Sequence, residues 1–62
     1  MSSREVIEAL KMAGWVLDSV RGDHHHFKHP FLPGKVTVPH PNKDVPLVII
    51  KLIEKQAGMT IR

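Results

Sequence analysis

A Gly22–Asp23 pair joins two strand-like segments, and this pair constrains the fold more than any other feature of the sequence. The segment before it, Trp15–Arg21, is rich in residues that favour strands, although its alternation of apolar and polar residues is imperfect. Because glycine and aspartate favour tight turns, the segment after it, His24–His29, is predicted to return antiparallel beside the first. The centre of the chain is therefore predicted to be a β-hairpin.

The second segment, His24–His29, is predicted to place different side chains on the two faces of the strand. Alternate residues of a strand point to opposite sides, so the segment divides into two sets of three. One set is His24, His26 and Lys28, and the other is His25, Phe27 and His29. Phe27 is the obvious core residue, so the set that contains His24 is predicted to face solvent.

The first part of the chain has the pattern of an amphipathic helix. Serines at positions 2 and 3 are good N-cap residues, and apolar residues recur at helical spacing from Val6 to Leu10. Gly14 supplies a residue that readily adopts the left-handed conformation in which helices end. A helix over about Ser3–Ala13 is predicted, with one apolar stripe that must pack on another element.

Beyond the hairpin, the sequence predicts a third strand and a second helix. Valines alternate in the strand Lys35–Val38, and the prolines at positions 39 and 41 are expected to end it. Asp44 is predicted to cap a helix over about Val45–Ala57, with Pro46 in its first turn and Gly58 after its end. This helix is predicted to carry one apolar stripe, made of Leu47, Ile50, Ile53 and Ala57.

The predicted order is helix, three antiparallel strands and helix, an α+β architecture with both helices on one face of the sheet. A single domain over residues 1–62 is expected. Val48, Ile49 and Leu52 make the second helix more apolar than one sheet requires. Either this helix lies between the first helix and the sheet, or it also offers an interface.

Composition narrows the kinds of partner and site. The chain has 62 residues and no cysteine, so disulfides and thiolate metal sites are excluded. Nine Lys and Arg against six Asp and Glu give a formal net charge of +3, which favours a polyanionic partner. No segment has the apolar length of a membrane span or the pattern of a signal peptide, so a cytoplasmic protein is expected.

Four histidines in six consecutive positions suggest proton-transfer chemistry, since histidine can both take and give a proton near neutral pH. Near an RNA phosphodiester, a histidine can take the proton of the ribose 2′-hydroxyl or donate one to the departing 5′-oxygen. Lys28, Lys35 and Arg21 can supply positive charge that holds the phosphate. Such a site needs no metal.

Other interpretations remain open from these residues alone. An exposed histidine is usually only a polar surface residue. His24 and His26 could chelate Zn²⁺ or Ni²⁺, but no cysteine or obvious carboxylate completes a tetrahedral site. His40 either lies near the histidine-rich strand or only marks the end of the third strand, and Trp15 is interpreted as a core anchor rather than a platform for stacked bases.

Several stretches of the sequence point to a known family. They are Ser2–Ile7 leading to Ala13–Trp15, then Gly22–Pro30, Val36–Pro41 and Ile53–Gly58, and they cover nearly the whole chain. Together they resemble the HicA toxins of bacterial and archaeal toxin-antitoxin pairs. The resemblance implies a double-stranded-RNA-binding-domain-like fold, α-β-β-β-α. It also implies a translation-independent mRNA interferase that halts translation and is held inactive by a HicB antitoxin.

The resemblance also implies a catalytic residue. In the HicA family the essential histidine is the first one after a Gly-Ser or Gly-Gly pair at the start of the second strand, and that position is His24 here. Asp23 stands where a small residue is usual. Its carboxylate can pair with His24 or repel an incoming phosphate, and either effect would weaken activity or change its dependence on pH. The second helix opens with Pro46–Leu47 instead of the Gly-Thr that is frequent in the family.

The leading hypothesis is therefore a HicA-like endoribonuclease that cleaves mRNA without a metal or other cofactor, with His24 as general base or acid. The predicted RNA-contact residues are His26, Lys28 and Lys35. The rival hypothesis is a small RNA-binding module without catalysis, and a third is a metal-handling protein. The expected partners are mRNA and a HicB-like antitoxin.

Overall fold

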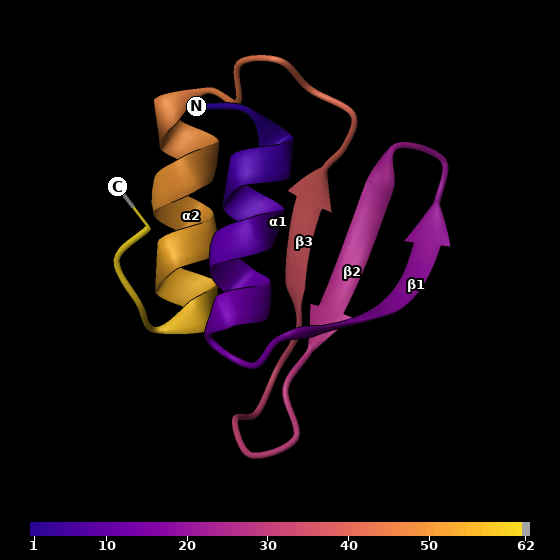
Figure 1. Ribbon diagram of the computed structural model, residues 1–62, viewed down its shortest axis with the longest axis vertical. Helices are drawn as coiled ribbons and strands as arrows, with labels where there is room; N and C mark the ends of the chain where they lie inside the picture. Colours follow the sequence, from indigo (N-terminus) through magenta and orange to yellow (C-terminus); the bar gives the residue numbers. More distant parts are fainter. Residues whose placement is uncertain (62) are drawn as a thin grey trace.

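Two helices and three strands make up the fold of the computed structural model, which describes residues 1–61. Their order is α1 (Ser3–Met12), β1 (Val16–Arg21), β2 (His24–Lys28), β3 (Val36–Pro39) and α2 (Leu47–Ala57). The strands form one antiparallel sheet in the order β1-β2-β3, and both helices lie on the same side of it (Figure 1). The α-β-β-β-α order predicted from the sequence is confirmed.

Helix α1 begins with a capping box. Oγ of Ser2 accepts the backbone N–H of Glu5 at 3.2 Å, and the Glu5 carboxylate accepts the backbone N–H of Ser2 at 2.9 Å. The hydrogen bond from the Ser2 backbone holds the pKa of the Glu5 carboxyl below its usual value. Val6 and Leu10 follow at helical spacing and are fully buried, so the predicted apolar stripe of α1 forms part of the core.

Gly14 follows α1 with a φ of 97°, a conformation that glycine adopts more easily than other residues. A Cβ atom at this position would also lie 2.8 Å from Nε2 of His29. That nitrogen lies 3.0 Å from the carbonyl oxygen of Ala13, while Nδ1 of the same ring accepts the backbone N–H groups of Phe31 and Leu32 at 3.1 and 3.2 Å. His29 therefore ties the end of α1 to the loop after β2.

Phe27 identifies the side of β2 that meets the helices. Its side chain is 1% exposed and belongs to a core that also contains Val6, Leu10, Trp15, Val36, Val38, Ile53 and Ala57. Alternate residues of a strand point to opposite sides, so His24, His26 and Lys28 lie on the side away from both helices, as predicted. We call this side of the sheet the open face.

Strand β1 pairs with β2 through a β-bulge. The register pairs Leu17 with Phe27 and Ser19 with His26, so Asp18 is the extra residue. This bulge accounts for the imperfect alternation seen in the sequence. All six residues of β1 are exposed, since the helices pack mainly against β3 at the other edge of the sheet (Figure 1).

The strand ends differ slightly from the sequence prediction. β2 ends at Lys28, so His29 lies in the loop that follows. β3 begins at Val36 rather than Lys35, and Pro39 is its last residue instead of the residue that stops it. Proline is tolerated there because β3 is an edge strand of the sheet.

The predicted start of α2 is wrong. The N-cap is Pro46, without a side-chain hydrogen bond, and the helix begins at Leu47 rather than Val45. The carboxylate of Asp44, predicted to be the cap, instead accepts a hydrogen bond from the N-terminal ammonium at 3.2 Å. The end of the helix is as predicted, with Gly58 in the left-handed conformation at φ 67°.

Helix α2 presents apolar side chains both to the core and to solvent. Ile50, Ile53 and Ala57 are buried as predicted, but Leu47 is 48% exposed. Val48 and Leu52 are 72% and 50% exposed, whereas Ile49 packs partly against the core. The surplus apolar residues of the sequence thus leave an exposed apolar surface. Within residues 1–61, neither helix has the length and apolar character needed to cross a membrane.

Candidate functional site on the open face of the sheet

His24 begins β2 on the open face, directly after the hairpin turn. Its side chain is 60% exposed, and its Nε2 lies 3.7 Å from Oδ1 of Asp23. This distance is longer than a hydrogen bond, and the Asp23 side chain is 76% exposed, so water and salt screen the pair. The Asp23 carboxylate predicted to pair with His24 is therefore a loose neighbour, and the imidazole is accessible to a ligand from solvent.

Arg21 and Pro39 flank His24 across the sheet. The register places Arg21 opposite His24 on β1 and Pro39 opposite it on β3. Because directly opposite residues share a face, the side chains of Arg21 and His24 leave the open face as neighbours. Within residues 1–61, Arg21 forms no ion pair. The geometry thus combines a proton-transfer group with an uncompensated positive charge.

His26 lies two residues further along the open face and is partly held by the sheet. Its Nδ1 is 2.9 Å from Oγ1 of Thr37, its cross-strand partner on β3. The bond orients the ring and leaves Nε2 without a hydrogen-bond partner in the described part of the chain. Although His24 and His26 share a face, no group of three His, Cys, Asp or Glu side chains in residues 1–61 converges as a metal site requires.

Lys28 and Lys35 are brought together by Asp18. The Asp18 carboxylate lies 2.9 Å from Nζ of Lys35 and 3.5 Å from Nζ of Lys28. The hydrogen bond from Lys35 and the charges of both lysines hold the pKa of the Asp18 carboxyl below its usual value. The carboxylate thus stays charged at neutral pH, and the pairing is lost only as the pH falls through that lowered pKa. We call these three residues the lysine cluster.

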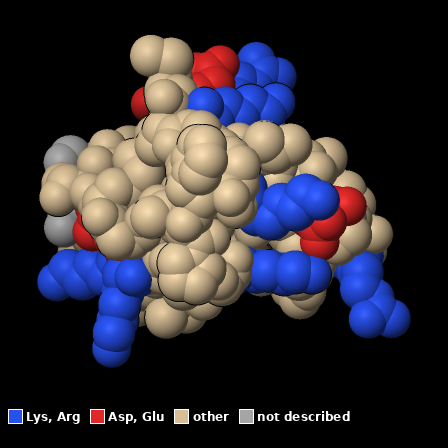
Figure 2. Space-filling model, turned by 90° about the horizontal axis from the view of Figure 1, so that it is seen from below, with Lys and Arg blue, Asp and Glu red and all other residues tan. Residues whose placement is uncertain are grey.

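The lysine cluster and His24 lie at opposite ends of β2. Lys28 is four positions after His24, which corresponds to roughly 13 Å along a strand. On the face of the molecule seen in Figure 2, Lys and Arg lie in several small groups with uncharged surface between the groups. The sequence-predicted site residues therefore share one side of the sheet without forming one compact cluster, and Arg21 is the cation nearest to His24 in the sheet register.

Two further histidines meet on the helix side of the sheet. The rings of His25 and His40 pack edge to face, with their centroids 4.8 Å apart. Nδ1 of His25 is buried and has no hydrogen-bond partner among the described residues. The open question about His40 is thus answered, because its ring packs against the histidine-rich strand.

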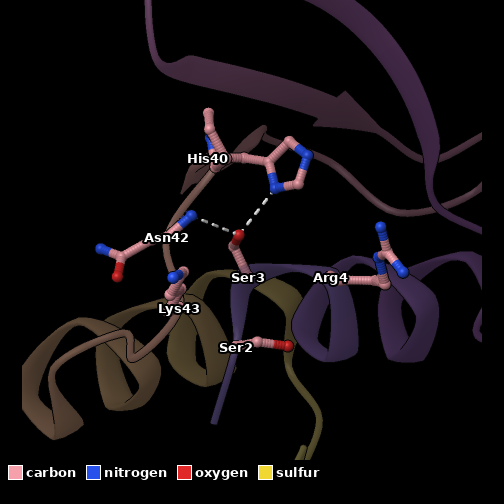
Figure 3. Close-up of a pocket in the computed structure, with 7 residues that line it drawn as sticks. Ser2, Ser3, Arg4, His40, Asn42 and Lys43 are labelled. Atoms are coloured by element: carbon pink, nitrogen blue, oxygen red, sulfur yellow. Dashed lines mark hydrogen bonds between the residues drawn. The ribbon is translucent and has the colours of Figure 1, made fainter.

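His40 is held by a serine at the start of α1 (Figure 3). Oγ of Ser3 lies 2.6 Å from Nδ1 of His40 and accepts the backbone N–H of Asn42 at 2.9 Å. The backbone N–H of Ser3 donates to the carbonyl oxygen of Asn42 at 2.8 Å. Because Ser3 is only 1% exposed, its hydroxyl fastens the loop after β3 to α1 and is not available as a nucleophile.

The sequence did not reveal the Ser3–His40 bond or the lysine cluster. A serine at a helix start predicts a cap, and nothing local connects it with a histidine 37 residues away. The sequence does contain one indication of the lysine cluster. Asp18 is the polar residue at which the alternation of apolar and polar residues in β1 fails, and this irregularity marks the bulge.

Fold and site together define a class of protein. Proteins of this class have a double-stranded-RNA-binding-domain-like α-β-β-β-α fold with an exposed histidine at the start of the middle strand, on the open face. The model of a family described as the HicA toxin of bacterial toxin-antitoxin systems matches residues 3–59. The chain therefore belongs to the HicA toxin family, which confirms the resemblance found in the sequence.

A solved structure supports the same assignment. The chain is similar to a protein in a structure described as the HicA3 and HicB3 toxin-antitoxin complex, with 30% sequence identity and a TM-score of 0.85. The match covers 97% of each chain. No curated protein matches the sequence. Family and structure agree that the chain is the toxin type of a toxin-antitoxin system.

Proposed function

We propose that this toxin is a metal-independent endoribonuclease that cleaves mRNA and blocks translation, with His24 as its catalytic histidine. The observation that carries the proposal is the imidazole on the open face, 60% exposed and opposite Arg21 in the sheet register. Histidine exchanges protons near neutral pH, and a guanidinium stabilises negative charge on a phosphate. The HicA resemblance, which implies an mRNA interferase, supports the same activity.

His24 can promote cleavage in either of two roles. As a base, the neutral imidazole takes the proton of the ribose 2′-hydroxyl while the 2′-oxygen attacks phosphorus and the bond to the 5′-oxygen breaks; solvent water then protonates the 5′-oxygen. As an acid, the imidazolium gives a proton to the departing 5′-oxygen, while solvent water takes the proton of the attacking 2′-hydroxyl. Either role contributes roughly 10²- to 10⁴-fold to the rate. Both leave a 2′,3′-cyclic phosphate and a 5′-hydroxyl, and Arg21 would offset the charge that builds on the phosphoryl oxygens.

We propose that the RNA strand continues from His24 along the open face. His26 offers its Nε2 midway, and Lys28 and Lys35 offer positive charge at the far end of β2. Asp18 already engages both lysines, so an RNA phosphate must compete with its carboxylate. Binding through the lysine cluster is therefore expected to be weak and to fall with added salt.

Asp18→Asn is expected to strengthen RNA binding, because Lys28 and Lys35 lose their internal counter-charge. The slope of log K against log salt should become steeper by roughly 0.7, the value for one additional phosphate contact on a single strand. Fluorescence anisotropy of a labelled single-stranded RNA over a range of salt concentrations measures both quantities. Glu8→Gln, on α1, makes the same change in net charge and should leave the slope unaltered. If Asp18→Asn also leaves it unaltered, the lysine cluster lies outside the RNA path.

Incubation of the purified protein with labelled single-stranded RNA tests the proposed activity. We expect cleavage that EDTA does not reduce, with products that end in a 2′,3′-cyclic phosphate. RNA with 2′-deoxyribose at the cleaved positions should resist, since it lacks the attacking hydroxyl. Binding without cleavage would instead support a small RNA-binding module, the rival function that the double-stranded-RNA-binding-domain-like fold favours.

We also propose that a HicB-like antitoxin is the protein partner and that it inhibits by covering His24. The similar solved structure is described as a complex of HicA3 with HicB3. The formal net charge of +3 would attract an acidic partner. Because His24 is already exposed, masking it requires no conformational change in the toxin. The exposed Val48 and Leu52 of α2 belong to the helix side, so a partner over His24 would reach them only around the edge of β3.

NMR with the protein encoded by the neighbouring reading frame tests this occlusion model. Addition of that protein should stop RNA cleavage and shift the ring resonances of His24. If cleavage stops while the His24 resonances and their titration with pH stay as in the free toxin, the antitoxin acts at another surface.

A further inference from the structure

A pocket lies beside the first turn of α1, outside the open face. It has a volume of about 490 Å³, within the range of about 300–1,000 Å³ that is usual for small-molecule sites. Its walls come from the start of α1 and from the loop between β3 and α2 (Figure 3). The lining residues are Ser2, Ser3, Arg4, His40, Pro41, Asn42 and Lys43.

The charge of this pocket is positive and uncompensated. Arg4 and Lys43 are exposed cations, no lining residue is acidic, and neither cation forms an ion pair within residues 1–61. The nearby carboxylates are engaged elsewhere, since Glu5 accepts the Ser2 N–H and Asp44 pairs with the N-terminal ammonium. By contrast, both lysines of the lysine cluster are neutralised in part by Asp18.

His40 gives the pocket an oriented polar wall. Nδ1 of the His40 ring is hydrogen-bonded to Oγ of Ser3. The same ring forms a T-shaped contact with the ring of His25, so two neighbours fix its orientation. Nε2 of His40 has no hydrogen-bond partner among the described residues. The backbone N–H groups of Ser3 and Glu5 are already used by Asn42 and Ser2, so neither of these two groups is free to bind a ligand.

The pocket lies close to His24. The backbone N–H of His40 donates to the carbonyl oxygen of Asp23 at 2.8 Å, and Pro39, the residue before His40, is opposite His24 in the sheet. Strand and chain spacings therefore put the Cα atoms of His24 and His40 within roughly 9 Å of each other. One single strand of RNA can thus run from His24 around the end of the sheet into the pocket.

We infer that this pocket binds a nucleotide of the RNA strand that neighbours the one cut at His24. Arg4 and Lys43 hold its phosphate, Nε2 of His40 hydrogen-bonds to its sugar or base, and Pro41 supplies apolar contact. A guanidinium and an ammonium are the groups that bind phosphate most readily in proteins. The inference rests on the proposed ribonuclease function, because it places the pocket on the path of that substrate.

The test compares three proteins, each carrying His24→Ala so that the RNA stays intact. These are the otherwise wild-type chain, the Arg4→Ala/Lys43→Ala variant, and Lys55→Ala as a control that removes a cation from the far end of α2. A single-stranded ribohexanucleotide is the probe, and inorganic phosphate is added separately. We expect the hexanucleotide to shift the His40 ring resonances. Arg4→Ala/Lys43→Ala should lower the salt slope by roughly 0.7 for each lost contact, and Lys55→Ala should not.

These binding measurements test the pocket as an RNA subsite independently of whether the protein cleaves RNA. If the hexanucleotide leaves the His40 resonances in place, or if the Arg4→Ala/Lys43→Ala variant keeps the full salt slope, the pocket is not an RNA subsite, whatever the cleavage assay shows. If inorganic phosphate alone shifts the resonances as strongly as the hexanucleotide does at equal concentration, the site binds free anions and the inference is overturned. A shift specific to RNA in a protein whose wild-type form cleaves nothing would support the pocket and reject the ribonuclease.

Discussion

Replacing His24 by alanine is expected to abolish RNA cleavage and to leave the fold intact. The loss of the only proposed proton-transfer group should reduce the rate by roughly 10²- to 10⁴-fold. The imidazole is 60% exposed and makes no hydrogen bond that holds the sheet, so its removal opens no cavity. The free energy of unfolding should change by no more than about 0.5 kcal/mol, as is usual for surface positions. Gel-based cleavage assays and thermal unfolding measure the two effects.

His24→Asn separates catalysis from binding. Asparagine keeps a polar side chain of similar reach but cannot exchange protons near neutral pH, so this variant should also be inactive while it still binds RNA. The pH profile of the wild-type protein then identifies the role of His24. Activity that rises as the imidazole loses its proton indicates a base, and activity that falls indicates an acid. Cleavage by His24→Ala at the wild-type rate would remove His24 from the mechanism.

Replacing Phe27 by alanine is expected to unfold most of the protein. Phe27 is 1% exposed in the centre of the core, and truncation of a buried phenylalanine costs about 3–5 kcal/mol. At about 0.05–0.15 kcal/mol per residue, a chain of 62 residues has a total stability of roughly 3–9 kcal/mol. The loss is therefore comparable with the whole stability, and circular dichroism during denaturation should show little or no cooperative transition.

Phe31→Ala provides the matched control for Phe27→Ala. It makes the same chemical change in the loop after β2, where the phenylalanine side chain is 89% exposed. Its unfolding free energy should stay within about 0.5 kcal/mol of the wild-type value. If the two variants unfold at similar denaturant concentrations, Phe27 does not make the contribution to the core that its burial indicates.

Local patterns predicted the elements of the fold because each pattern has a local physical cause. The Gly22–Asp23 turn, the helix stops at Gly14 and Gly58 and the burial of Phe27 all follow from backbone freedom or strand periodicity, and all are confirmed. The start of α2 was predicted wrongly because Asp44 could serve two partners. It pairs with the N-terminal ammonium, a group 43 residues away that no local pattern reveals.

The candidate site was predicted only where strand periodicity determines it. Alternation in β2 correctly placed His24, His26 and Lys28 on one side of the sheet. It could not show that Asp18 binds Lys28 and Lys35, because a β-bulge shifts the register of β1 by one residue. Contacts between distant segments, such as Ser3 with His40, depend on how the loop after β3 packs on α1 and have no counterpart in sequence spacing.

His24 and Phe27 are an odd number of positions apart in β2, and this spacing couples the stability of the protein to its proposed chemistry. Residues three apart in a strand point to opposite sides, so every register of β2 that buries Phe27 also exposes His24. A slip by one residue would exchange the two and lose the core together with the accessible imidazole. Misregistration of β2 should therefore yield an unfolded chain rather than a folded but harmless toxin. Inhibition of this protein in the cell would then require a separate molecule that binds it, since β2 has no alternative register that is both folded and inactive.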